Sequence, residues 1–82
     1  MFRITLMEEG KVKETAVYNT IEAVKDSADV KAFIDFIIEN DSDTDVEIIK
    51  NEIKECETIE ELKAVFVEHF DYSWLTLIVE EI

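Results

Sequence analysis

The spacing of apolar residues changes twice along this chain, and these changes limit the folds that it can adopt. From Phe2 to Met7, apolar and polar residues alternate, which is the period of a half-buried β-strand. Between Ser27 and Phe70, apolar residues recur every three or four positions, which is the period of an amphipathic helix. Alternation returns from Tyr72 to Val79. The pattern predicts an α+β fold with strands at both ends of the chain and helices between them.

The only glycine marks the first turn. Gly10 lies in the polar segment Glu8–Lys11, and it can supply the positive φ that tight hairpin turns require. Residues 12–18 are β-prone and are expected to pair back onto the first strand. Lys13 and Glu14 interrupt their alternation, so the pattern alone does not set the register.

Capping residues divide the central segment into helices. The predicted caps are Asn19 with Glu22 as its capping-box partner, Ser27, either Thr44 or Asp45, and Thr58 with Glu61. The first cap begins a short helix over residues 20–25. The apolar stripes of the longer helices are Val30, Phe33, Ile34, Ile37 and Ile38; then Val46, Ile49 and Ile53, with Cys56 one turn further; then Ile59, Leu62, Val65, Phe66 and Phe70.

The last predicted strand, Tyr72–Val79, is apolar on both faces. One face carries Leu75, Leu77 and Val79, and the other carries Tyr72, Trp74 and Ile78. Such a strand is usually central or covered on its outer side. We expect it beside the first strand, in a small three-stranded, mostly antiparallel sheet with helices packed on one face. The 82 residues form one domain, with a core of Ile4, Leu6, Phe33, Ile37, Leu62, Phe66, Leu75 and Leu77.

Charge is the most unusual property of the chain, and it is unevenly distributed. The formal net charge is −13. Residues 1–34 contribute only −1, whereas residues 35–82 hold fifteen acidic and three basic residues and contribute −12. Such a field repels nucleic acids and anionic membranes and attracts basic surfaces. We therefore expect no direct nucleic-acid or membrane partner, and a basic protein partner instead.

No catalytic constellation is found, so we expect a binding protein and not an enzyme. One glycine cannot build a phosphate-binding loop. Cys56 lies among glutamates, which raise a thiol pKa, and it cannot form an internal disulfide. His69 is the only histidine, so a zinc site with two imidazoles is excluded. The sequence indicates no cofactor. The absence of an apolar leader or membrane segment and the lone cysteine favour the cytoplasm.

One acidic segment resembles an EF-hand calcium loop. The alternating carboxylates Asp41, Asp43 and Asp45, followed by Glu47 and Glu52, have the spacing of that loop. Its obligatory glycine is replaced by Val46, and a β-branched residue resists the turn that the glycine makes. No metal site is predicted, and the segment is interpreted as a solvated loop.

Two functions from different classes fit these features. In the first, the chain is an inhibitor or regulator that occupies the basic nucleic-acid-binding surface of a partner. It is similar in size, charge and lack of catalytic residues to small acidic phage and mobile-element proteins, including DNA mimics and some anti-CRISPR proteins. The expected contacts are Glu47, Glu52, Glu55, Glu60, Glu61 and Glu68.

In the second, the chain is a structural or adaptor module that binds through Tyr72, Trp74 and Ile78, with its charge serving solubility. Both hypotheses describe a monomer or weak dimer.

Overall fold

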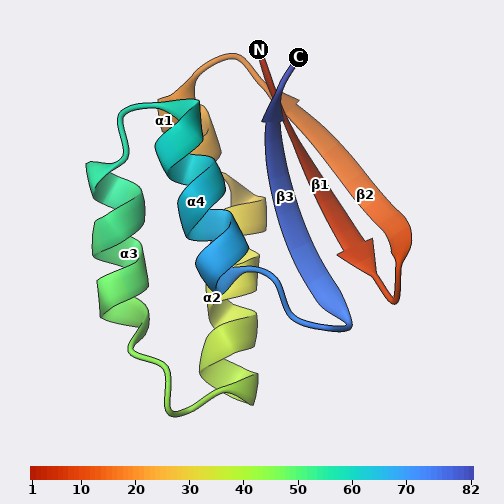
Figure 1. Ribbon diagram of the computed structural model, residues 1–82, viewed down its shortest axis with the longest axis vertical. Coiled ribbons are helices and arrows are strands. Elements are labelled where there is room, and N and C mark those ends of the chain that lie inside the picture. The colour runs from red at the N-terminus through yellow and green to blue at the C-terminus, as the bar shows by residue number, and fades with distance from the viewer.

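The computed structural model describes residues 1–82 as a three-stranded sheet with four helices (Figure 1). The elements are β1 (Phe2–Glu8), β2 (Lys11–Tyr18), α1 (Ile21–Lys25), α2 (Ala28–Asn40), α3 (Val46–Glu55), α4 (Ile59–His69) and β3 (Leu75–Glu81). The α+β prediction is confirmed. No helix combines the length and hydrophobicity needed to cross a bilayer.

The sheet has the order β2-β1-β3, and both of its strand pairs are antiparallel. The last strand lies beside the first, as predicted, but it is an edge strand and not a central one. The helices gather on one face of the sheet, with α4 against β3 and α3 against α2 and α4 (Figure 1). The other face is left without a covering layer.

The β1–β2 hairpin shows why the alternation fails there. Glu9 and Gly10 both have positive φ, 52° and 79°, as a two-residue turn between right-twisted strands requires. Leu6 pairs with Glu14, whereas Met7 pairs with Val12. The intervening Lys13 is therefore the extra residue of a β-bulge. The interruption in the sequence marks a real irregularity in the register.

The core lies between the sheet and the helices. Most of the predicted core residues are buried, and Leu6 and Leu75 are half-buried against them. One position of the predicted α2 stripe differs. Ile38 is 50% exposed, because it lies at the edge of the stripe, and the half-buried Phe36 packs against the aromatic rings instead.

The helix caps follow the predictions with one correction. Ser27, Asp45 and Thr58 cap α2, α3 and α4. The cap of α1 is Thr20 and not Asn19, because the Thr20 hydroxyl accepts the Ala23 N–H at 3.0 Å. At the other end of α3, Cys56 does not continue the helix. It is the C-cap residue, with extended backbone, although its side chain remains buried.

The capping box of α4 gives a first testable expectation. The Thr58 hydroxyl accepts the Glu61 N–H at 3.2 Å, and the Glu61 carboxylate accepts the N–H groups of Glu57 and Thr58, both at 3.1 Å. The bond from the Glu57 N–H is the main reason that the pKa of Glu61 lies below its ordinary value. A carboxyl with a lowered folded-state pKa stabilises the fold above its ordinary pKa, and this contribution is lost as pH falls through the lowered value.

We expect Thr58→Ala to lower the free energy of unfolding by about 1 kcal/mol at neutral pH. Glu61→Gln should also destabilise the fold at neutral pH, and its difference from the parent protein should shrink in acid. Urea unfolding at pH 7 and at about pH 3 measures both effects. A Glu61→Gln penalty that is the same at both pH values would contradict this account of the cap.

Candidate functional site

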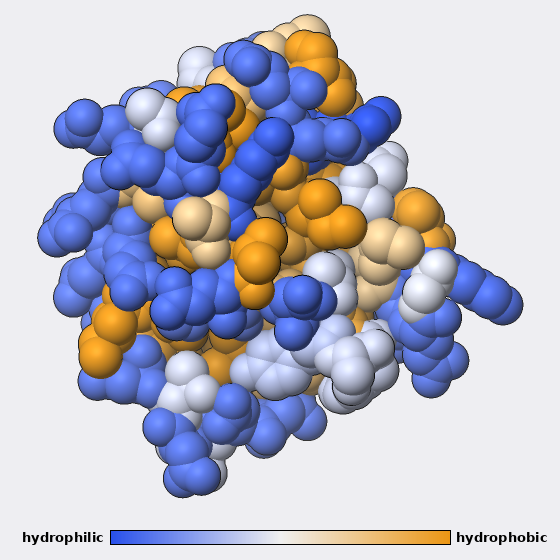
Figure 2. All heavy atoms as spheres, in the orientation of Figure 1, coloured by the Kyte–Doolittle hydropathy of each residue, from blue (hydrophilic) through white to orange (hydrophobic).

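The six glutamates predicted to contact a partner lie on two neighbouring helices. Glu47, Glu52 and Glu55 belong to α3, and Glu60, Glu61 and Glu68 belong to α4. The buried stripes of α3 and α4 face the core, which directs most of their acidic side chains outward. Figure 2 shows hydrophilic residues covering most of the helical side of the molecule.

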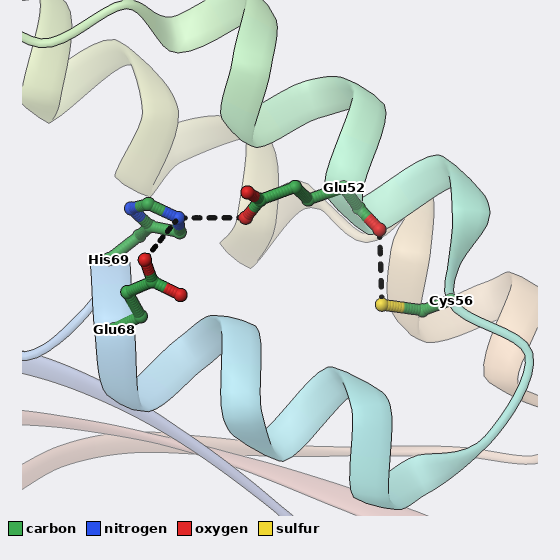
Figure 3. Close-up of polar contacts among 4 residues, drawn as sticks. All are labelled: Glu52, Cys56, Glu68 and His69. Carbon is green, nitrogen blue, oxygen red and sulfur yellow. Dashed lines mark hydrogen bonds and ion pairs between the residues drawn. The ribbon is translucent and has the colours of Figure 1, made fainter.

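A histidine joins the two helices within this acidic surface. His69 Nε2 lies 2.8 Å from Glu52 Oε2 and 3.9 Å from Glu68 Oε1 (Figure 3). Glu52 comes from α3, whereas Glu68 and His69 come from the end of α4. The sequence did not reveal this contact. The contact brings carboxylates from both helices together.

The other four predicted contact glutamates differ in whether a contact within the protein already holds their side chains. Glu61 is held by the capping box. Glu47 has a loose ion pair with Lys50, at 3.5 Å, on the same helix. Glu55 and Glu60 are exposed and form no ion pair. The structure therefore separates structural carboxylates from those that are free to meet a partner.

Glu52, Glu68 and His69 are the one group of side chains in the fold that could hold a metal ion. Their donor atoms, from Glu52, Glu68 and His69, lie within 4.8 Å of one another. The lone histidine excludes only a zinc site with two imidazoles, whereas this group combines one imidazole with two carboxylates. However, His69 and Glu52 already form a short hydrogen bond between α4 and α3, which holds them together without a metal ion. Glu68 is largely exposed to water.

The EF-hand-like spacing is split between a loop and a helix. Asp41, Asp43 and Asp45 lie in the connection between α2 and α3, whereas Glu47 and Glu52 lie within α3. The Asp41 carboxylate accepts hydrogen bonds from Thr44 at 2.7 Å and from Tyr72 at 3.1 Å, and that from Thr44 is the main cause of its lowered pKa. Glu52 turns towards His69 and not back towards the loop.

We therefore expect calcium at micromolar concentration to leave the melting temperature unchanged in about 150 mM salt. Thermal unfolding with calcium and with magnesium as the control measures this. A saturable calcium-specific rise that Asp41→Ala abolishes would contradict the expectation.

The cysteine is a structural residue of this region. Cys56 is buried, and its thiol donates to the Glu52 carbonyl at 3.1 Å (Figure 3). Its pKa is raised, as predicted from the sequence, but burial is the main cause, and the nearby Glu61 carboxylate adds to it. A raised pKa keeps the sulfur protonated and unreactive at neutral pH.

The predicted aromatic interface is divided by the structure. Tyr72 and Trp74 precede β3 and pack against Phe36 of α2, with ring centroids 5.3 and 5.2 Å away. Ile78 lies within β3 opposite Thr5, and it is 40% exposed. The bend at Ser73–Trp74 breaks the strand alternation, so the prediction that these three side chains share one strand face is wrong.

A different apolar surface lies between α4 and β3. A groove of about 520 Å³ runs there over Phe66, Leu77 and Val79. Val67 on its α4 side is 71% exposed. Figure 2 shows apolar side chains gathered between these two elements and framed by hydrophilic ones. The sequence patterns did not reveal this groove, because it arises from the packing of a helix beside an edge strand.

No protein-family model, curated protein or solved structure matches the chain. The surfaces described above are therefore the basis for assigning a function.

Proposed function

We propose that the chain is a non-catalytic binding protein whose α3 and α4 cover the basic nucleic-acid-binding surface of another protein. In this role it inhibits or regulates that partner in the cytoplasm, as DNA-mimic and anti-CRISPR-like proteins of phages and mobile elements do. The observation that carries the proposal is the meeting of carboxylates from two helices at His69, 2.8 and 3.9 Å from its Nε2 atom.

The rigidity of the acidic surface supports this role. Side chain caps fix the N-termini of both helices, and buried stripes fix their orientation. The His69–Glu52 hydrogen bond adds a link between them. Carboxylates on such a support are already positioned before binding, so little ordering entropy is lost when a partner arrives.

The density of charge also supports it. Duplex DNA carries about one charge per 1.7 Å of axis, so a segment as long as the 33 Å axis of this molecule carries about 19. Residues 35–82 have a net charge of −12. This value is within a factor of two of the duplex, although the charge is spread over more than one face. A basic groove built for phosphates would therefore attract this molecule.

The proposal is tested by capturing partners from a host lysate at about 50 mM and about 500 mM salt, a range over which exposed charge interactions become strongly screened. Proteins identified by mass spectrometry should include nucleic-acid-binding proteins that are lost at high salt. Adding competitor DNA or RNA should release the same proteins. Captured proteins that stay bound at high salt and in the presence of competitor DNA or RNA would contradict the proposal.

The groove between α4 and β3 favours a second function, that of a structural or adaptor module. Its floor is apolar, and Val67 and Ile78 at its rim are exposed, as interface anchors are. Binding there would depend little on salt. Val67→Glu should abolish it while leaving an interaction through the acidic helices nearly intact, so this variant distinguishes the two functions.

A further inference from the structure

A groove on the other side of α3 has the opposite charge character from the acidic surface. It lies where the end of α1 meets α2 and α3, and its volume is about 450 Å³. Its floor is formed by Val30, Ile34 and Ile53. A volume of this size is sufficient for a small organic ligand.

Four of the seven lysines in the chain line this groove, together with one acidic residue. They are Lys25 from α1, Lys31 from α2, and Lys50 and Lys54 from α3. In a protein with 21 acidic residues this is a local excess of positive charge. On α3, Lys50 and Lys54 therefore line this groove, whereas Glu52 is directed to His69 of α4.

Two of the four lysines interact with other groups of the protein. Lys25 Nζ donates to the carbonyls of Lys54 and Cys56, both at 2.8 Å, and so caps the C-terminus of α3. Lys50 has the loose contact with Glu47 at 3.5 Å. Lys31 and Lys54 form no ion pair.

Stability alone does not explain this arrangement. Lys50 and Lys54 are four residues apart on one helix, where like charges repel and destabilise it slightly. Acidic residues are plentiful in this chain, yet few lie at the groove. An anion placed between the lysines would relieve their repulsion.

We propose that this groove binds a small organic phosphate, with its phosphates at Lys31, Lys50 and Lys54 and its apolar part on Ile34 and Ile53. Several ammonium groups around one site suit a group with more than one negative charge, and lysine binds phosphate as a point charge. The floor provides apolar surface for the remainder of the ligand.

The size of the ligand follows from the surrounding field. At physiological ionic strength a charge is screened within about 8 Å, so a small anion experiences mainly the lysines beside it. A long polyanion such as DNA or RNA would extend over the acidic helices and be repelled. The groove therefore selects a compact phosphate compound over a nucleic acid.

The test uses ADP, with adenosine and inorganic pyrophosphate as its two parts. Binding is followed by the methyl NMR signals of Ile34 and Ile53 and by calorimetry. ADP should bind saturably and at least about tenfold more tightly than either part, a difference that corresponds to 1.4 kcal/mol. The variant K31E/K54E should weaken ADP binding by at least about tenfold, and the hairpin variant K11E/K13E is the control of equal charge.

Binding that both double variants weaken equally would show that only net charge matters and would overturn the proposal. The absence of saturable ADP binding at millimolar concentration would overturn it too, as would pyrophosphate binding as tightly as ADP. If K31E/K54E does not fold, the neutral pair K31Q/K54Q replaces it, with the same expected loss. None of these outcomes depends on the acidic surface, so the two proposals can fail separately.

Discussion

Replacing Phe66 by alanine should lower the free energy of unfolding by about 3–5 kcal/mol, the usual cost of emptying the space of a buried aromatic ring. Phe66 is 2% exposed and lies on the face of α4 that packs against β3. Its ring centroid is 4.9 Å from that of Phe70, and Phe70 in turn packs on Phe33 of α2 at 4.7 Å. The Phe66 ring is therefore linked to α2 through Phe70.

The adjacent residue provides a matched control for this change. Val67 is 71% exposed, and Val67→Ala should alter the free energy of unfolding by no more than about 0.5 kcal/mol. Urea denaturation of the two variants beside the parent protein measures both values. A total stability of about 4–12 kcal/mol is ordinary for 82 residues, so Phe66→Ala should remove about a quarter of it or more. A loss below about 1 kcal/mol would show that the core is not organised around this helix.

Reversing three exposed glutamates of the acidic helices should slow partner binding by about tenfold to a hundredfold, because clustered charge accelerates encounter by electrostatic steering. The appropriate residues are Glu55, Glu60 and Glu68. Glu52 and Glu61 are left intact, since one is bonded to His69 and the other belongs to the capping box. The variant E55K/E60K/E68K should remain folded, because these side chains are exposed and the change lowers like-charge repulsion.

The hairpin offers a control with the same change in net charge. E8K/E9K/E14K also replaces three carboxylates by ammonium groups, in the β1–β2 hairpin, whose turn lies on the opposite side of the molecule from α3 (Figure 1). One ion pair, Glu8–Lys13 at 3.3 Å, is lost, and a surface pair of this kind contributes about 0–1 kcal/mol. Its effect on the association rate should be much smaller, because the steering field is local.

The sequence predicted the elements well because their signals are local. Gly10 placed the hairpin, and Ser27 and Thr58 placed the starts of two helices, since a cap depends only on the next few residues. The same logic chose Asn19 as the cap of α1, one residue before the true cap Thr20, whose hydroxyl accepts the Ala23 N–H. The start of β3 was misplaced because the aromatic residues before it mimic a strand.

The surfaces could be predicted only in part. The acidic character of α3 and α4 follows from composition. The His69–Glu52 bridge joins residues 17 positions apart, and it depends on how two helices pack. The lysine-lined groove combines residues from three helices, and Lys25 reaches α3 from 29 positions away. Such contacts arise from tertiary packing, for which the one-dimensional pattern carries no signal.

The central claim is that the acidic helices α3 and α4 meet a basic partner, and it is tested most directly by one rate. A partner captured from lysate is immobilised, and its association rate constant is measured at about 50 mM salt for the parent protein and the two triple variants. The account predicts that E55K/E60K/E68K associates at least about tenfold more slowly than E8K/E9K/E14K, and that high salt removes the difference. Equal rates for the two variants at low salt would contradict the claim and would leave the α4–β3 groove as the binding surface.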